Sequence, residues 1–238
     1  MKIKVLFERV AQDDCKRKFA TGWGLSYLLG DDLLFDTGEK FEYLARNAEL
    51  MNVDLKKITK VFISHEHWDH TGGLWDLLEM NNSVTVYGCS RFSNEFKDKV
   101  AGFKAEFVET SEKHVVKEGV HSLGETLGNY KGKIISEQAL IIDGEKLTVL
   151  CGCAHPSLQN ILEKARMVYG KDIGCSFGGF HLMDKDKRFA EYIVSQAEKL
   201  TDKIGISHCT GHEAENLIVK YFNHRCFHVQ VGMEIDTR

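Results

Sequence analysis

The stretch HEHWDH, from His65 to His70, constrains the fold of this chain most strongly. It places three histidines, one glutamate and one aspartate in six residues, directly after the short apolar run VFIS. An apolar run of this length predicts a buried strand, and rigid scaffolds place functional groups in the loops at strand ends. Surface histidines beside a helix-capping aspartate are the ordinary alternative, but a cap does not need three histidines. The stretch therefore predicts a metal site.

The spacing within HEHWDH predicts how its side chains are directed. On an extended chain residues two apart face the same way, so His65, His67 and Asp69 should share a face while the intervening Glu and Trp point elsewhere. His70 precedes the tight turn 71–73, which leads into the next helix. Two imidazoles in step suit one borderline-soft divalent ion, and the adjacent Asp69 and His70 suit a second.

Three further histidines, His155, His181 and His208, stand at or just after the ends of apolar runs. We expect them near the same chemistry. His212 follows His208 by four residues, a spacing typical of helical zinc pairs, but Thr and Gly between them are poor helix formers. We therefore place His212 early in the next helix rather than among the ligands. The other histidines are expected to be surface or core residues.

Length and composition indicate a globular protein of one domain over residues 1–238. The 238 residues are 43% hydrophobic and 28% charged, and the net charge of −4 argues against a dedicated nucleic-acid or anionic-membrane binder. The apolar run near the first residues is too short for a signal peptide, and no stretch approaches a membrane span, so a cytoplasmic location is expected. Seven cysteines without a CxxC pair predict free thiols, with a ligand or redox role for one of them left open.

The order of strand and helix patterns indicates an α/β (α+β) fold. Residues 25–29 and 32–38 have the pattern of a hairpin, and a β-rich centre runs from Lys104 to Leu150. That centre argues against a doubly wound parallel sheet and favours helices outside two stacked mixed sheets. Helical periodicity is expected over residues 41–51, 74–80, 92–100, 158–169, 188–200 and 213–222.

Several motifs resemble those of the metallo-β-lactamase superfamily. SHEHWDHTGG is similar to its HxHxDH signature, LLFDTG to the strand end that precedes it, and CGCAHPSLQNIL to its third-histidine motif. GGFHL, HCTGH and WGLSYLL resemble the subgroup of hydrolases similar to 7,8-dihydropterin-6-yl-methyl-4-(β-D-ribofuranosyl)aminobenzene 5'-phosphate synthase. The resemblance covers nearly the whole chain. It implies a four-layer αββα sandwich of two mixed β-sheets flanked by helices, with a metal site at one edge between the sheets.

The resemblance also implies a ligand set. His65, His67 and His155 would bind one metal, and Asp69, His70 and His208 would bind the other. Asp36 would orient a ligand histidine through the free N–H of its ring. The alternative for Asp36 is ordinary turn chemistry in Asp-Thr-Gly.

One departure from the superfamily pattern concerns the bridge between the metals. Many members bridge them with an Asp at the end of the strand after the third motif, but the corresponding stretch here, DIGCSFGGFH, has none. His181 and Cys175 are the candidates to replace it, and the subgroup resemblance favours His181 as a metal or substrate ligand. Without a carboxylate between two cations, the site should favour one tightly held ion.

These residues predict a metal-dependent hydrolase. A divalent metal would activate water, and Asp69 would orient it as the catalytic carboxylate. The expected substrate is an ester, preferably a phosphoester of a small pterin-like or nucleotide-like molecule. Segments 104–144 and 19–23 would wall the pocket. The expected cofactor is one or two divalent ions, zinc first, with Mn, Fe or Ni as other candidates. The alternatives are an RNA-processing nuclease, which the acidic charge disfavours, an iron-dependent redox enzyme, and a non-catalytic metal-binding sensor.

Overall fold

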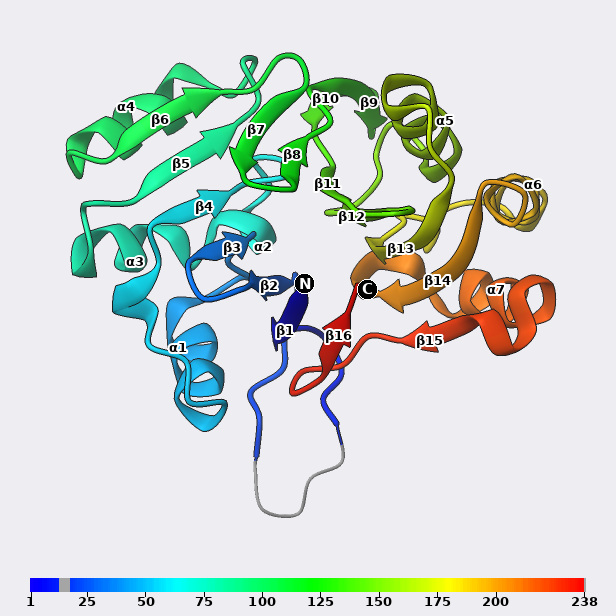
Figure 1. Cartoon of the computed structure of the whole chain (residues 1–238), viewed down its shortest axis with the longest axis horizontal. Coiled ribbons are helices and arrows are strands. Elements are labelled where there is room, and N and C mark those ends of the chain that lie inside the picture. The colour runs from blue at the N-terminus through cyan, green and yellow to red at the C-terminus, as the bar shows by residue number, and fades with distance from the viewer. Residues whose placement is uncertain (13–17, 238) are drawn as a thin grey trace. The chain divides into compact units, whose positions relative to one another are not determined.

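The structure, a computed structural model, describes residues 1–12 and 18–237 (Figure 1). Cys15 lies outside these residues. The chain divides into two compact units, Met1–Ser111 with Gln230–Arg238 (unit 1) and Glu112–Val229 (unit 2). Each unit contains one seven-stranded sheet and its own helices. The single domain expected over residues 1–238 stays a prediction.

The sheet of unit 1 is half antiparallel and half parallel. Its strand order is β16-β1-β2-β3-β4-β5-β6, antiparallel from β16 to β3 and parallel from β3 to β6. The predicted hairpin is the β2–β3 pair. The strands are β1 (Lys2–Phe7), β2 (Ser26–Leu29), β3 (Leu33–Phe35), β4 (Lys60–Phe62), β5 (Thr85–Gly88), β6 (Glu106–Glu109) and β16 (Glu234–Asp236).

The helices of unit 1 connect its parallel strands. α1 (Phe41–Leu50) joins β3 to β4, α2 (Trp68–Thr71) and α3 (Leu74–Met80) join β4 to β5, and α4 (Asn94–Gly102) joins β5 to β6. A 3₁₀ turn, η1 (Leu55–Lys57), precedes β4. One apolar core forms where the sheet packs on α1, α3 and α4 (Figure 1). Each of these helices buries one apolar stripe in this core, so the predicted periodicity matches them closely.

The sheet of unit 2 repeats this division. Its order is β15-β14-β13-β12-β11-β8-β7, parallel from β15 to β12 and antiparallel from β12 to β7. A separate hairpin pairs β9 with β10. The strands are β7 (His114–Lys117), β8 (Val120–Ser122), β9 (Thr126–Tyr130), β10 (Lys133–Glu137), β11 (Leu140–Asp143), β12 (Leu147–Cys151), β13 (Ile173–Gly179), β14 (Thr201–Ser207) and β15 (Cys226–His228).

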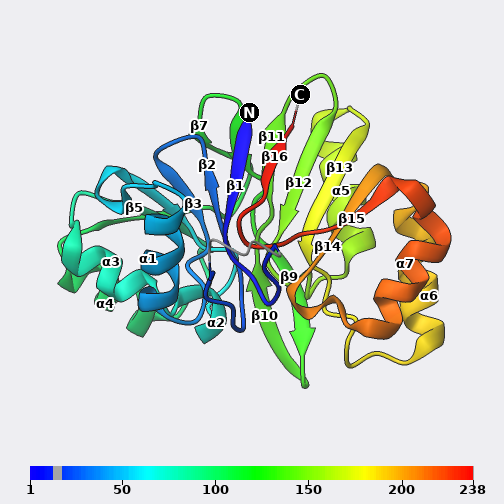
Figure 2. The ribbon, with the colours of Figure 1, turned by 90° about the horizontal axis from the view of Figure 1, so that it is seen from below.

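Three helices cover one face of this second sheet. α5 (Leu158–Tyr169), α6 (Lys187–Ala197) and α7 (His212–Phe222) follow β12, β13 and β14 in turn, and lie on the same side of those strands (Figure 2). Their apolar stripes form the core of unit 2. Two 3₁₀ turns, η2 (His208–Thr210) and η3 (Asn223–Arg225), flank α7. The predicted α/β class with two mixed sheets and flanking helices is confirmed.

This topology gathers the chemistry of each unit at one edge of its sheet. Parallel strands point their carboxyl ends the same way, and functional groups of open α/β sheets collect there. In unit 1 the loops after β3 and β4 carry Asp36 and the HEHWDH stretch. In unit 2 the loops after β12, β13 and β14 carry His155, His181 and His208. Within the described part of the chain, no helix has the length and apolar character needed to cross a membrane.

Candidate metal centre

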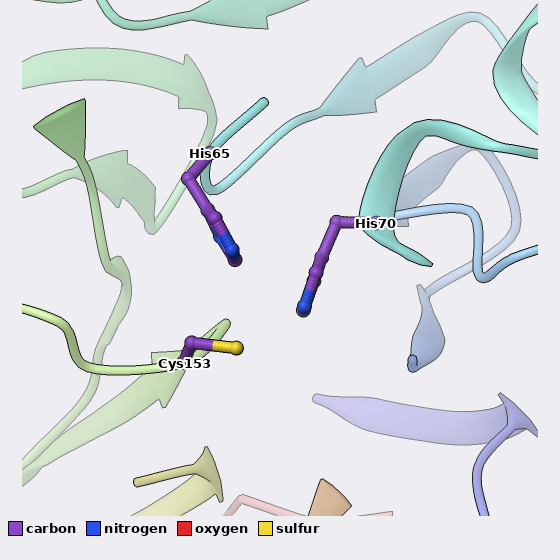
Figure 3. Close-up of side chains that lie close together, drawn as sticks. All are labelled: His65, His70 and Cys153. Atoms are coloured by element: carbon purple, nitrogen blue, oxygen red, sulfur yellow. The ribbon is translucent and has the colours of Figure 1, made fainter. Parts of the chain in front are cut away.

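Three imidazoles of HEHWDH come together in unit 1. The Nε2 atom of His65 lies 3.0 Å from Nδ1 of His67, and the rings of His65 and His70 have centroids 4.2 Å apart. Figure 3 shows the rings of His65 and His70 extending from two separate backbone segments toward the same region. His65 and His70 are fully buried. Two imidazole nitrogens at the 3.0 Å of the His65–His67 contact can be joined by a hydrogen bond or by a cation that both bind.

The backbone of this stretch differs from the expected extended chain. It is extended only as far as His67 (φ −66°, ψ 144°), and α2 begins at Trp68. The prediction that Asp69 continues the alternation of His65 and His67 is therefore wrong. Helix geometry instead places Asp69 in the first turn, where its Oδ2 lies 3.6 Å from Nε2 of His70. Strand alternation fails here because the backbone becomes helical at Trp68 and keeps right-handed helical angles through Gly72 and Gly73 into α3.

Asp36 organises the imidazoles of unit 1. Its Oδ1 accepts the backbone N–H of Ser64 and its Oδ2 accepts the Ser64 hydroxyl, both at 2.7 Å. Oδ2 also accepts Nδ1–H of His70 at 2.7 Å. Because the Ser64 hydroxyl proton points to Asp36, its oxygen accepts Nδ1–H of His65 at 2.9 Å. Both histidines therefore direct Nδ1 into this network, and Nε2 lies on the opposite side of each ring, where it meets His67 Nδ1 (from His65) and Asp69 Oδ2 (from His70).

The two intervening residues point elsewhere, as expected. The Glu66 carboxylate accepts the backbone N–H and the hydroxyl of Ser93, at 2.7 and 2.6 Å, where Ser93 caps α4. The Trp68 side chain is 60% exposed. Glu66 is thus adjacent to the histidines in sequence, but its carboxylate bonds the cap of α4.

Unit 2 brings together a second set of donors. The ligand atoms of Cys153, His155 and His181 lie within 4.8 Å of one another, and so do those of Cys153, His208 and Cys209. The His155 and His181 rings have centroids 4.5 Å apart, and Tyr130 packs against both. The structure therefore groups the three predicted histidines of this unit with two thiols that the sequence did not single out.

Glu137, at the end of β10, holds the loop that carries two of these donors. Its side chain is 1% exposed and accepts three backbone N–H groups, from Cys153 (2.8 Å), Ala154 (2.7 Å) and His155 (2.7 Å). Sequence reasoning missed Glu137 because it looked like an ordinary polar residue between two strands. The available signal was a carboxylate within an otherwise apolar β-rich segment.

Left-handed backbone conformations concentrate at the candidate residues. Asp36, His181 and His208 have φ values of 53°, 44° and 47°. L-residues adopt this region at a cost of order 1–3 kcal/mol, and only where the surroundings fix them. At these three strand ends the left-handed backbone gives each side chain a direction that a continued extended strand would not give it.

The choice between His181 and Cys175 is informed by their surroundings. His181 belongs to a donor group, and its Nδ1 is buried without a hydrogen-bond partner among the described residues. Cys175 belongs to none of the donor groups found in the described chain. Burial raises the pKa of the Cys175 thiol to about 12, so it is neutral at pH 7. His181 is the better candidate ligand of the two.

Comparison with known proteins identifies the fold. The family model described as the metallo-beta-lactamase superfamily matches residues 24–135. A solved structure, that of Tm1679, a metal-dependent hydrolase of the beta-lactamase superfamily, covers 100% of this chain and 99% of its own with a TM-score of 0.82 at 25% identity. This chain has the metallo-β-lactamase fold.

Two curated relatives differ in their activities. The 7,8-dihydropterin-6-methyl-4-(beta-D-ribofuranosyl)-aminobenzene-5'-phosphate synthase of Methanocaldococcus jannaschii is 27% identical over 248 residues, covering 84% of each chain. Ribonuclease Z of Lactobacillus delbrueckii subsp. bulgaricus is 30% identical over 125 residues, which span 50% of this chain and 36% of that protein. Similarity to these proteins is thus compatible with more than one reaction.

The donor sets fit the divalent cation that the superfamily implies. Two nitrogens bound to one tetrahedral zinc at about 2.0–2.1 Å lie roughly 3.3 Å apart. The 3.0 Å between His65 Nε2 and His67 Nδ1 is within a few tenths of an ångström of that spacing. The Nδ1 atom of His181 is buried without a hydrogen-bond partner among the described residues, and a bound cation would satisfy it. Imidazole, carboxylate and thiol together suit Zn²⁺ and similar ions better than Mg²⁺ or Ca²⁺.

A pocket of about 610 Å³ lies beside the donors of unit 2. His155 and His181 line it together with Phe189 and Tyr192 of α6 and with Lys185. Lys185 forms no ion pair with any described residue. Of the segments expected to wall a pocket, 104–144 contributes residues 127–129 to this one, whereas the role of segment 19–23 in unit 1 stays a prediction. The pocket has the size and mixed lining typical of small-molecule sites.

Proposed function

We propose that this protein is a metal-dependent hydrolase that cleaves a phosphoester of a small pterin-like or nucleotide-like substrate with a metal-activated water. The observation that carries the proposal is the Asp36–Ser64 network, which fixes the tautomers of His65 and His70 with both Nε2 atoms turned away from it. Preorganised, buried imidazoles are the arrangement that metal hydrolases use. The relative named as a phosphate synthase supports a phosphorylated substrate.

The proposed ligands follow the superfamily pattern. His65, His67 and His155 would hold one cation, and Asp69, His70 and His208 the second, with His181 as a further ligand. The assignment of residues from both units to shared cations rests on the sequence motifs alone. A bound divalent cation lowers the pKa of coordinated water toward about 7 and stabilises negative charge that develops in the reaction.

We assign separate roles in catalysis and substrate binding to the side chains of both units. Asp69 Oδ2, in a side chain only 5% exposed, orients the attacking water and accepts its proton. Asp36 keeps the proton on Nδ1 of His70 throughout. In unit 2, Lys185 supplies a positive charge for a substrate phosphate, and Phe189 and Tyr192 offer flat apolar surfaces for a ring.

Turnover of bis(4-nitrophenyl) phosphate and 4-nitrophenyl phosphate by zinc- or manganese-loaded protein tests this proposal. Asp69→Asn should lower kcat at least about 100-fold, the usual contribution of a positioned general base. Glu66→Gln is the matched control, because Glu66 is a carboxylate of the same motif that bonds only Ser93 in unit 1, and it should stay within about twofold of wild type.

Two outcomes would contradict the hydrolase, and a third would contradict its catalytic carboxylate. Metal binding without turnover of any ester would favour a sensor. Tight iron without esterase activity would favour redox chemistry. Equal activity of Asp69→Asn and Glu66→Gln would remove the catalytic carboxylate from the proposal.

A nuclease is the second candidate, since the ribonuclease Z relatives match half of this chain. A short single-stranded RNA included in the same assay separates the two. We expect little cleavage of it, because a net charge of −4 gives no general attraction for a phosphate backbone.

A further inference from the structure

Two cysteines from distant parts of the sequence meet in unit 2. Cys153 follows β12 and Cys209 lies in η2 after β14, 56 residues later, yet their Sγ atoms are 3.3 Å apart. Both side chains are buried, with exposed fractions of 3% and 2%. Cys153 is one of the side chains drawn in Figure 3.

The surroundings of these thiols differ from those of a cysteine that merely fills the core. Cys151 belongs to the apolar core of unit 2, and Cys89 to that of unit 1. Cys153 and Cys209 belong to neither core. Their neighbours are imidazoles instead, because Cys153 groups with His155 and His181 and also with His208 and Cys209. Their buried surroundings therefore include imidazoles as well as apolar side chains.

Both sulfurs are held in place by the backbone. The N–H of Cys153 donates to Glu137 Oε1, which fixes the loop that presents its thiol. The N–H of His181 donates to Sγ of Cys209 at 3.2 Å. An N–H donor favours negative charge on the sulfur that accepts it. The pair is thus positioned from β10, β12, β13 and β14 together.

The Cys209 thiol donates a hydrogen bond to Cys153 Sγ, and the distance between the sulfurs is closer to shared coordination than to a disulfide. A disulfide bond is about 2.05 Å long. Two thiolates on one tetrahedral zinc, each about 2.3 Å from it, would lie roughly 3.8 Å apart. The observed 3.3 Å needs a shift of about half an ångström to reach that spacing, less than half of what a disulfide would require.

We propose that Cys153 and Cys209 are thiolate ligands of a borderline-soft divalent cation, together with His208. The inference rests on the proposed metal dependence and goes beyond its ligand set. It supplies negative charge to a centre whose sequence lacks the bridging aspartate. On binding, each thiol releases one proton to solvent as its sulfur lone pair forms the metal bond. Sulfur ligands should make the centre prefer Zn²⁺, Co²⁺ or Cd²⁺ to Mn²⁺.

Cobalt provides the direct test. The full chain, stripped of metal with a chelator and reloaded with Co²⁺ alone, should show the intense near-ultraviolet charge-transfer band of cobalt thiolates. Cys153→Ser and Cys209→Ser should each remove about half of that band. Cys151→Ser and Cys175→Ser, thiols of the same unit outside the donor groups, are the matched controls and should leave it unchanged.

A second measurement needs no variant and therefore holds even if a substitution prevents folding. X-ray absorption of the zinc-loaded wild-type protein should show sulfur near 2.3 Å in addition to nitrogen near about 2.0–2.1 Å. Absence of sulfur at the zinc, a cobalt spectrum without the charge-transfer band, or a band that only Cys175→Ser removes would overturn the proposal.

Failure of the thiolate ligands and failure of the proposed hydrolase give different results. A charge-transfer band in a protein that hydrolyses no ester would leave the ligands standing and remove the hydrolase. Ester hydrolysis by the zinc-loaded protein without sulfur at the zinc would support the hydrolase and remove the thiolate ligands.

Discussion

Single carboxylates fix the geometry of each donor group. Asp36 accepts three hydrogen bonds in unit 1, and Glu137 accepts three in unit 2. Hydrogen bonds to a buried ionised acceptor are stronger than neutral ones, and their loss leaves donors unsatisfied. The strongest single-residue effects outside the ligands should therefore come from these two side chains.

Asp36→Asn should weaken both metal affinity and stability. The amide replaces one acceptor oxygen by a donor, which would face the His70 ring N–H or a Ser64 donor. We expect affinity for zinc to fall about 10–100-fold and the free energy of unfolding to fall by about 2–4 kcal/mol. Competition with a chromophoric chelator and urea denaturation measure the two effects. Asp31→Asn, at an exposed turn, should change neither, and an unaltered affinity in Asp36→Asn would show that Asp36 is only a turn residue.

Glu137→Gln should destabilise unit 2 although it removes no ligand. A glutamine offers one acceptor oxygen to three N–H groups now shared by two oxygens, so at least one donor is left unsatisfied. The free energy of unfolding should fall by about 2–4 kcal/mol, measured by urea denaturation. Glu145→Gln, an exposed residue between β11 and β12, should cost no more than about 0.5 kcal/mol. Equal stability of the two variants would mean that the loop after β12 is held by other contacts.

At the scale of elements, the two sheets place functional loops by the same means. Parallel strands joined through helices bring every loop of one kind to one edge, and glycines allow the closest approaches there. At Gly178 in β13, φ is +127° and an added Cβ would lie 1.9 Å from the carbonyl oxygen of Cys151. Neighbouring strands can therefore hold the His155 and His181 loops together only if residue 178 lacks a side chain.

Gly178→Ala should cost about 3 kcal/mol or more, since it combines a backbone clash with a conformation that L-residues avoid. Gly102→Ala at the end of α4 is the control, because its Cβ would meet nothing within 4 Å. That substitution should be neutral or stabilise by up to about 1 kcal/mol. Thermal and urea denaturation give both values. A tolerated alanine at 178 would show that β12 and β13 can separate without loss.

For the whole molecule, bound metal should contribute measurably to stability. A ligand that binds only the folded chain adds about 2.7 kcal/mol when it is present at 100 times its Kd. Chelation should therefore lower Tm by roughly 5–10 °C, and zinc should restore it where magnesium does not. Elemental analysis should find one tightly held ion and a second that dialysis removes, because no aspartate bridges the pair. An unchanged Tm after complete metal removal would contradict a cation site in the folded chain.

The sequence by itself determined the fold class, most helices and the residue types of the site. Apolar periodicity depends on neighbours two to four positions apart, so it was sufficient for α5, whose predicted bounds match, and for the β2–β3 hairpin. The dense histidines of HEHWDH indicated metal ligands for the same local reason. They could not indicate that α2 begins at Trp68, because alternation of side chains applies only while the backbone stays extended, and here it is extended only to His67.

Only the tertiary structure decided which distant side chains meet. Strand order in unit 2 brings Cys153 and Cys209 together across 56 residues, and places Glu137 under the loop of His155. Nothing in the local pattern of a lone cysteine or glutamate encodes such a partner, since sheet register is set by the burial of whole strands. Composition and spacing therefore predicted candidate ligand types, whereas packing determined how each side chain is held and which thiols lie beside them.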